Sequence, residues 1–497
     1  MDSSLQILEL SRIIKNFGNK NSKSLFQSNQ KKSQIRALAR KFAFQSGENE
    51  HDWALEICRT SEHDQKYIRI RSQLKRLLIS RVFHLDIRSG SELRKAIYRN
   101  AKELFCIRVL IMLGARGAAV ALIPRALDRA RTFELTNDRI ELLHILRQHA
   151  TINGYRKKFA EYQKELDDVE RIRCAERRLN ALDDAINVEL VGRARAPKAA
   201  IELAKSARAE AEMLFREFPR FNVGVHYYRI ATLAAETSRQ FTELIRLCSE
   251  AEYFLAQFPH LVTPLFAGQY AIKRLTPSIA LSNESSTVSA LEICERSFPV
   301  GENNWFIWKE CEFFFRMHTG DFESAQRVFA SIAGNDRFQS QPEQVRQKWA
   351  LLGYYADFAR SAKSPSAPVR LRAFHHILRE TPIYKKDKAG YNASLYILQY
   401  LIAASRSDHE TLLQRSEAIA KYTSRYLRNR HEQQLYAFLK TLQVLRKHDF
   451  NVDETAIRAR RYIKQFSVRG KELIDETQVL PYPMMWLWIS EWLRKSY

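Results

Sequence analysis

Glycine and proline are scarce in this chain, with 15 and 13 copies among 497 residues. A chain of many short strands needs such residues at its turns, so their scarcity argues against an all-β fold. No apolar run reaches the roughly 18 residues of a membrane span, because the closest, from Val109 to Pro124, contains Arg116 and two glycines. The first residues, MDSSLQILELSRII, lack the basic region and the cleavage site of a signal peptide. We therefore expect a cytoplasmic protein with no membrane span.

Cysteine is also sparse, and no two cysteines are close enough to form a CxxC pair. The six cysteines are Cys58, Cys106, Cys174, Cys248, Cys294 and Cys311. Most of them lie among apolar residues in segments of helical periodicity, as small buried hydrophobic residues do. This pattern is typical of a reducing compartment and predicts neither a disulfide framework nor a zinc site.

The usual catalytic signatures are missing as well. No glycine-rich phosphate loop and no GxSxG elbow occurs in the sequence. His409-Glu410 and His431-Glu432 each begin like the helix of a zinc protease, but neither is followed by the second histidine. The adjacent His375 and His376 would point about 100° apart on a helix. We expect no metal, no cofactor and no enzymatic activity, although residues distant in sequence could still assemble a catalytic site.

Positive charge is abundant and unevenly distributed. The formal net charge is +24, with +10 over residues 1–100, +5 over 101–200, −2 over 201–350 and +11 over 351–497. Two basic ends around a neutral middle favour polyanions or an acidic partner. The alternative is a soluble protein that is basic without a function for its charge.

A predicted helical hairpin spans Asn303 to Ala333. Its first half, WFIWKECEFFFRM, is apolar on all sides of a helical wheel and predicts a buried helix. Gly320 suits the left-handed residue that ends such a helix, and Asp321 suits the cap of the next. The next helix presents one apolar face, formed by Phe322, Ala325, Phe329 and Ile332.

Helical periodicity extends through most of the chain. Apolar residues at spacings of three and four from Tyr155 to Ile186 predict one helix of about nine turns, packed along its neighbours, with a coiled coil as the alternative. Tyr67 to Arg71 alternate like a strand, but Leu74, Leu77, Leu78 and Val82 continue with helical spacing, so a helix is predicted here too. The carboxylate pairs Asp167-Asp168 and Asp183-Asp184 are expected on the solvated face of the long helix.

Hairpins recur along the chain. A polar turn precedes an aromatic residue or histidine at four predicted second-helix starts, which lie 86, 81 and 87 residues apart: Tyr155, Phe241, Phe322 and His409. Further breaks are expected midway between them, at 196–197, 284–286, 364–366 and 451–453. The step is therefore roughly 40 residues, a size typical of two-helix repeats. We predict an all-α, right-handed superhelix (solenoid) of antiparallel helical hairpins. Its expected parts are a basic N-terminal helical region (1–135), the repeat solenoid (136–480) and a C-terminal capping helix (481–497).

The turn from Gly320 to Ala325, with Phe329 four residues on, resembles the turn and second helix of a tetratricopeptide repeat. The resemblance implies that Ala325 is the small close-packing residue and that Phe322 and Phe329 are the packing aromatics. Trp305, Trp308 and Gly320 are further residues expected to serve repeat packing. The first helix lacks the Trp-Leu-Gly-Tyr spacing of that family, and the step exceeds its usual 34 residues. The segments 381–388 and 480–483 are also similar to a Bacteroidetes-type family of bacterial helical-repeat proteins, which brings no known activity.

These features predict a scaffold or adaptor that binds a protein segment on a concave surface, with partner identity and oligomeric state left open. The alternative is sequence-nonspecific RNA or DNA binding through the basic ends, with Tyr422 and Tyr426 stacking on bases. The candidate polyanion contacts are Lys385, Lys386, Lys388, Arg425, Arg428, Arg458, Arg460, Arg461 and Lys464, and the last four are expected on one helix. Solvated helix faces are the plainer interpretation of these clusters. Near the C-terminus, Trp486, Trp488 and Trp492 predict a docked terminal helix, or alternatively a helix for a partner or membrane surface.

Overall fold

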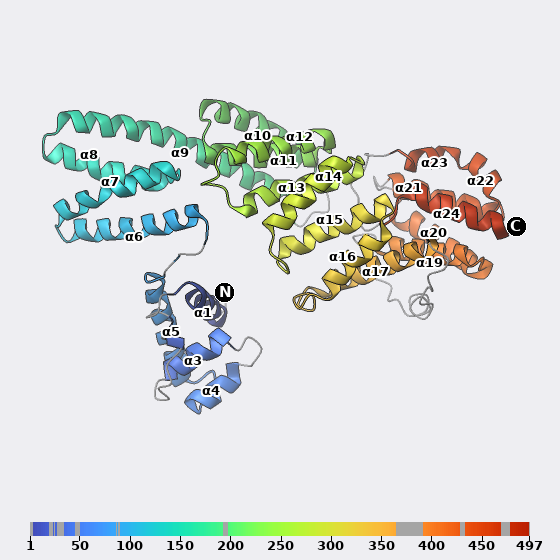
Figure 1. The fold of residues 1–497 in the computed structure, drawn as a ribbon, viewed down its shortest axis with the longest axis horizontal. Helices are drawn as coiled ribbons and strands as arrows, with labels where there is room; N and C mark the ends of the chain where they lie inside the picture. The colour runs from blue at the N-terminus through green and yellow to red at the C-terminus, as the bar shows by residue number, and fades with distance from the viewer. Residues whose placement is uncertain are drawn as a thin grey trace. The chain divides into compact units, whose positions relative to one another are not determined.

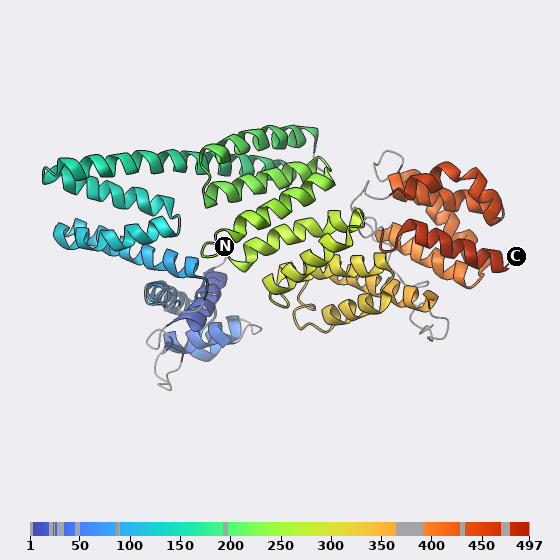
Figure 2. The same cartoon turned by 45° about the horizontal axis from the view of Figure 1, so that its top comes forward.

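The structure is a computed structural model that describes residues 3–18, 23, 25–26, 34–44, 50–85, 87, 90–191, 197–363, 391–427, 433–468 and 478–496. Within these ranges the chain forms 22 helices and no strand, apart from one isolated bridge between Gly18 and Leu85. Figures 1 and 2 show neighbouring helices running antiparallel to one another. The prediction of an all-α chain is confirmed.

Two compact units make up the chain. The first comprises Met1–Arg178, Arg220–Val223 and Phe258–Thr263, and the second comprises Leu179–Pro219, Gly224–Gln257 and Pro264–Tyr497. The division falls within the longest helix, α9 (Arg156–Leu190). The predicted limits at residues 135 and 480 stay predictions.

The first unit begins with four helices around a core of their own. These helices are α1 (Ser3–Phe17), α3 (Gln34–Phe44), α4 (Glu50–Cys58) and α5 (Gln65–Val82). In α5, Tyr67, Ile70, Leu74 and Leu78 are buried at spacings of three and four, which confirms the helix over the alternating segment. Phe42 and Trp53 meet edge to face, with 5.1 Å between their ring centroids.

A stack of antiparallel helices follows in the same unit. It consists of α6 (Glu92–Met112), α7 (Arg116–Thr132), α8 (Thr136–Ile152) and the first part of α9. Ser91 caps α6 by accepting a hydrogen bond from the Arg94 amide. Leu104, Ile123, Leu142 and Leu166 lie in the shared core of the stack. Because each helix buries one face against its neighbour, the stack is held by one apolar layer.

The predicted nine-turn helix is confirmed as α9, which is 35 residues long. Leu166, Val169, Leu179 and Ile186 are buried along it, at the spacing expected of one face. The first turn departs from this pattern, because Tyr155 and Phe159 are exposed.

The second unit continues as hairpins. Its helices up to residue 363 are α10 (Lys198–Glu217), α11 (Phe221–Thr237), α12 (Phe241–Ala256), α13 (Pro264–Ala280), α14 (Glu284–Ser297), α15 (Asn303–Thr319), α16 (Phe322–Ala333) and α17 (Glu343–Lys363). The remaining helices are α19 (Tyr391–Ser405), α20 (His409–Tyr426), α21 (Gln433–Lys447), α22 (Val452–Arg458), α23 (Arg460–Phe466) and α24 (Tyr482–Ser496). The predicted second-helix starts at Phe241, Phe322 and His409 are confirmed, and α9 begins one residue after Tyr155.

The hairpin of α15 and α16 has the predicted local structure. Gly320 ends α15 in the left-handed conformation, with φ 75° and ψ 17°. Asp321 caps α16 by accepting a hydrogen bond from the Ser324 amide, at 3.2 Å. Local chemistry therefore produces this turn, since only a residue without a side chain adopts that φ at no steric cost.

Two local predictions in the second unit are wrong. The break expected at Glu284 to Ser286 is the start of α14, which Asn283 caps. Arg458, Arg460, Arg461 and Lys464 were expected on one helix, but Ala459 separates α22 from α23. Both errors concern helix ends, where capping contacts decide the boundary.

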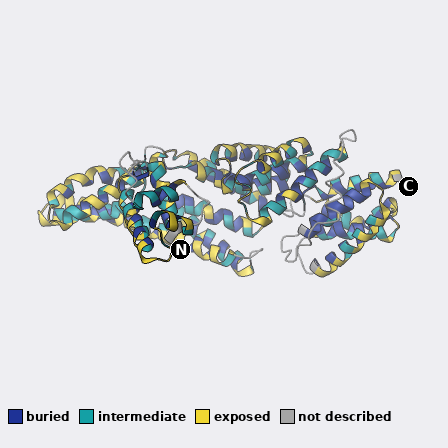
Figure 3. Ribbon diagram, turned by 90° about the horizontal axis from the view of Figure 1, so that it is seen from below, coloured by how far each residue is buried: buried dark blue, intermediate teal, exposed yellow. Residues whose placement is uncertain are grey.

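The terminal helix α24 is docked, as predicted. It packs against α19, α22 and α23. Trp488 also reaches Phe322 and Phe358, at centroid distances of 5.9 and 6.4 Å, and Trp492 reaches Phe358 at 6.0 Å. The contacts of α24 therefore extend from the last hairpin back to α16 and α17, and one apolar core runs from α13 to α24. Figure 3 shows buried positions in dark blue along these helices.

Candidate functional site

The first helices of successive hairpins form one layer in the second unit. We call α11, α13, α15 and α17 the first-helix layer; α13 packs directly on α15. Three side-chain pairs join consecutive helices of the layer: Glu236 to Lys273 at 3.5 Å, Thr276 to Cys311 at 4.0 Å, and Glu310 to Lys348 at 2.7 Å. Because every step of the layer has such a link, the links mark one continuous face.

Apolar side chains are exposed on the same face. Ile307 lies three and four residues before Glu310 and Cys311, so it is about one turn from both linking residues. Leu265, at the start of α13, lies eleven residues or about three turns before Thr276 and therefore on the same side of the helix. Ile307 is 49% exposed and Leu265 is 48% exposed. Exposed apolar residues among half-buried polar ones are typical of a surface that binds a protein segment.

The polar links of this face include one thiol and one close ion pair. Burial raises the pKa of the Cys311 thiol to about 12, so the thiol is neutral near pH 7 and a poor nucleophile. Lys348 and Glu310 satisfy each other as an ion pair. Within the described ranges, no group of three histidine, cysteine or carboxylate side chains could hold a metal ion.

The residues expected to serve repeat packing lie behind this face. Trp305, Trp308, Phe322 and Ala325 are buried in the core. Phe329 is half-buried against Gly353 of α17, where an added Cβ would lie 2.6 Å from its ring. The aromatic residues of this hairpin thus contact the following helix as well as their own.

A glycine–phenylalanine pairing that was not predicted from the sequence occurs in the two preceding hairpins. A Cβ at Gly224 would lie 2.3 Å from the ring of Phe254, and a Cβ at Gly268 would lie 2.3 Å from the ring of Phe298. In both hairpins the phenylalanine follows its glycine by 30 residues (224 to 254 and 268 to 298). The signal was present as this repeated spacing, which a search for turns alone does not detect.

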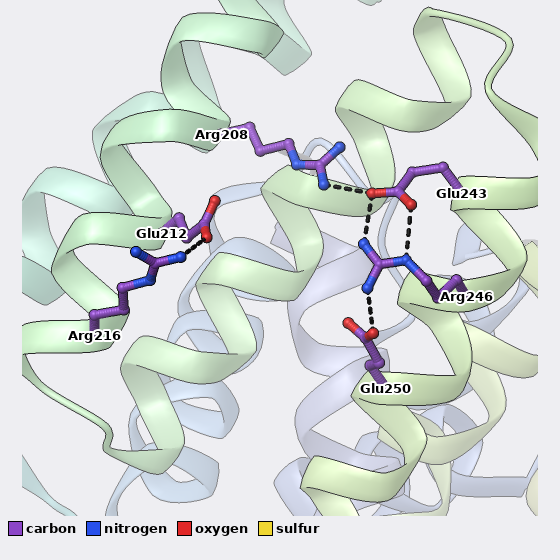
Figure 4. A network of polar contacts seen from close by, with 6 residues as sticks. All are labelled: Arg208, Glu212, Arg216, Glu243, Arg246 and Glu250. Carbon is purple, nitrogen blue, oxygen red and sulfur yellow. Dashed lines mark hydrogen bonds and ion pairs between the residues drawn. The ribbon is translucent and has the colours of Figure 1, made fainter.

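Charged residues on α10 and α12 are engaged with one another (Figure 4). Arg246 donates to both carboxylate oxygens of Glu243, at 2.8 and 2.7 Å, and also contacts Glu250. Arg208 of α10 donates to the same Glu243. Hydrogen bonds from Arg246 and Arg208 lower the pKa of Glu243 to about 2. These guanidinium groups are therefore occupied within the protein.

A second polar cluster lies inside the hairpins. Arg274 of α13 is buried and pairs with Glu252 of α12 at 3.1 Å. The guanidinium also donates to the hydroxyls of Ser249 and Ser289, at 3.5 and 3.4 Å. Burial raises the pKa of Glu252, and the charge of Arg274 opposes that rise. The cluster joins three helices, and we assign it a structural role because buried charges need such partners.

The expectation that Asp183 is solvated is wrong. Its side chain is 5% exposed and pairs with Arg229 of α11, and Asn187 donates to its carboxylate at 3.2 Å. The long helix therefore buries a carboxylate where it meets α11. Burial, together with the charge of Arg229, lowers the pKa of the neighbouring His226.

The first unit has its own carboxylate cluster. Asn222 donates to the Glu134 carbonyl oxygen and to the Glu176 carboxylate, each at 3.0 Å. Thr136 donates to the same Glu176 oxygen at 2.9 Å. Burial raises the pKa of Glu176. These hydrogen bonds stabilise the turn between α7 and α8. Glu134 lies in that turn and has a positive φ of 48°.

The predicted polyanion contacts are only partly described. Lys385, Lys386, Lys388 and Arg428 lie outside the described residues, as do His375 and His376. Arg425, Arg458, Arg460, Arg461 and Lys464 are exposed.

Some of these groups already have partners. Arg458 pairs with Glu454 at 3.6 Å, and Arg461 donates to the Tyr462 hydroxyl at 2.6 Å. Tyr422 is buried against Tyr396. The expectation that Tyr422 stacks on bases is therefore wrong, because its ring is not accessible.

All six cysteines are free thiols. Cys58, Cys248 and Cys294 are buried and Cys311 is half-buried, as expected for most of them. Cys106 and Cys174 are exposed, which their apolar sequence neighbours did not indicate.

Comparisons with known proteins leave the chain without an assigned family. No family model matches it, and searches of curated proteins and of solved structures give no match. The resemblances to tetratricopeptide repeats and to a Bacteroidetes-type family therefore stay predictions. Among the described residues, no helix has the length and apolar character needed to span a membrane.

Proposed function

We propose that this protein is a non-enzymatic scaffold that binds a segment of a partner protein along the first-helix layer. The layer would form the concave surface of a right-handed, tetratricopeptide-like superhelix. One observation carries the proposal: linked polar pairs and exposed apolar side chains share one face of consecutive hairpins. Repeat proteins use extended surfaces of this kind for binding.

The spacing of the first helices supports the repeat interpretation. The helices α11, α13, α15 and α17 begin at residues 221, 264, 303 and 343. Successive starts are thus 43, 39 and 40 residues apart, near the expected step of about 40. Each hairpin has an apolar face that it cannot bury alone, so stacking on neighbours is the stable arrangement.

A cytoplasmic location belongs to the same proposal. Six free thiols suit a reducing compartment. A scaffold there would have segments of other cytoplasmic proteins available as partners.

Affinity capture from a native lysate tests the scaffold proposal. The wild-type chain should recover a protein partner, and the double variant Leu265→Glu/Ile307→Glu should lose it. Val288→Glu is a matched control, because Val288 is 44% exposed but lies on the second helix α14. Retention of the partner by the double variant would place binding elsewhere. Repeated recovery of no protein, with turnover in a substrate screen, would overturn the proposal.

Nucleic-acid binding through the basic ends is the second proposal. Its support is the group of exposed cations on α22 and α23. Phosphate binding releases counterions, so affinity should fall steeply as salt rises. Replacing Arg458, Arg460, Arg461 and Lys464 with Glu should weaken binding to every oligonucleotide sequence alike. A filter-binding assay at low salt tests this proposal. If micromolar protein retains no oligonucleotide, the excess of positive charge serves solubility and not nucleic-acid binding.

A further inference from the structure

The outer face of α6 carries exposed apolar side chains. The adjoining face of the helix packs on α7 and α8, through buried residues that include Leu104 and Ile107. On the outer face, Ile97, Phe105 and Met112 are 48%, 49% and 74% exposed. A regular helix at the end of a stack normally presents polar residues to water. This exposed apolar face is therefore a feature to be explained.

The exposed residues form one stripe. Ile97, Ala101, Phe105 and Met112 are separated by four, four and seven residues, which places them along a single face of a helix. At the C-terminal end of the stripe, Leu113 adds a further exposed side chain. Phe83, at the end of α5, widens the stripe, because its ring lies 5.2 Å from that of Phe105.

The shape of the stripe suits another helix. On the stripe, the small Ala101 lies between Ile97 and Phe105. Arg108, which pairs with Glu141 of α8, lies between Phe105 and Met112. Alternating large and small side chains make the ridges and grooves into which a second helix packs. A surface built to enter a lipid bilayer would instead carry bulky residues throughout.

The charge of this face selects the partner. Arg94, Arg99 and Lys102 are exposed on α6 close to the stripe. The carboxylates of α6 are Glu92, which pairs with Lys95, and Glu103, which is bonded to Arg129 of α7. Glu141 of α8 pairs with Arg108, so α6 keeps an excess of cations. A second copy of this chain would bring the same cations against these, and like charges repel.

We infer that the outer face of α6 binds an amphipathic helix with acidic flanks, supplied by another protein. The bound helix would continue the stack that α6, α7, α8 and α9 begin, and it would cover the stripe from Ile97 to Met112. Its glutamates or aspartates would meet Arg94, Arg99 and Lys102. This surface lies in the first unit and is separate from the first-helix layer, so it does not depend on the scaffold proposal.

A designed peptide tests the inference on the full-length chain. The probe is a fluorescent, helix-forming peptide of 21 residues, the length of α6. It carries leucines at heptad a and d positions and glutamates beside them. We expect saturable binding by fluorescence anisotropy that weakens as salt rises, because ion pairs at an exposed rim are screened. A peptide with the same leucines but lysines in place of the glutamates should not bind.

Two variants and a control locate the binding. Met112→Glu puts a charge on the stripe at an exposed position, so folding should be unaffected and the affinity should fall at least about tenfold. The double variant Arg99→Glu/Lys102→Glu should bind the acidic peptide more weakly than wild type, and it should not bind a neutral peptide more tightly. Val188→Glu is the control, because Val188 is also 74% exposed but lies on α9; it should bind like wild type.

Several outcomes overturn the inference. Equal binding of the acidic and lysine peptides would show that charge does not select the partner. Wild-type affinity in Met112→Glu would show that the peptide does not bind on the stripe. Concentration-dependent dimerisation that Met112→Glu abolishes would make a second copy the occupant. Binding to phosphatidylglycerol vesicles that Met112→Glu abolishes, without peptide binding, would make a lipid surface the occupant. Failure of lysate capture on the first-helix layer would leave this result unaffected.

Discussion

Replacing Gly268 with alanine should destabilise the second unit, although alanine is the better helix former. Gly268 lies within α13, where a glycine-to-alanine exchange alone would gain about 1 kcal/mol. An added Cβ would lie 2.3 Å from Cζ and 2.6 Å from Cε2 of Phe298. Favourable carbon contacts lie at about 3.5–4.0 Å, so the ring must move by more than about 1 Å.

The ring has little room to move. Phe298 is buried, and the Cβ of Ser297 would also lie 2.8 Å from the new atom. Overpacking of this kind costs about 1–3 kcal/mol, and so close an approach belongs in the upper part of that range. After subtraction of the helix gain, we expect a net loss of about 1–2 kcal/mol.

Urea unfolding followed by circular dichroism measures the effect as a shift of the midpoint. Because the chain has two units, midpoints are compared rather than one unfolding free energy. Gly117→Ala is the control, since Gly117 lies in α7 and nothing is within 4 Å of its added Cβ; this variant should be as stable as wild type or slightly more so. Gly268→Ala/Phe298→Leu should recover part of the loss, as coupled neighbours do. A Gly268→Ala chain as stable as wild type would refute the steric argument.

Three further predictions use the same measurement or a simple labelling assay. Glu243→Gln should lower the urea midpoint at pH 7. Because the pKa of Glu243 is held near 2, the ionised carboxylate stabilises the fold above the ordinary glutamate pKa. The difference in midpoint between wild type and variant should therefore shrink as pH falls from 5 towards 2. Asp183→Asn should cost on the order of 1 kcal/mol, because it leaves the half-solvated Arg229 without its carboxylate; an unchanged midpoint would contradict the pairing. A thiol reagent should label Cys106 and Cys174 in the native protein and the other four cysteines only after unfolding; fast labelling of more than two would contradict the burial pattern.

The sequence alone determined most of the helices. The periodic burial of α9 and the turn at Gly320 and Asp321 depend on residues within a few positions of each other. Contacts of that range are encoded in spacing and in single-residue conformational preferences, which can be read without a fold. The mistakes at Glu284 and Ala459 were limited to helix ends, where preferences of neighbouring residues compete.

The tertiary structure decided everything that joins distant segments. The burial of Asp183 depends on Arg229, which is 46 residues away, and the docking of Trp488 depends on Phe322 and Phe358. The exposure of the apolar stripe on α6 could not be predicted from the sequence either. An apolar stripe has the same sequence pattern whether or not a neighbouring helix covers it. Helical periodicity specifies which residues share a face, whereas packing between helices specifies what that face meets.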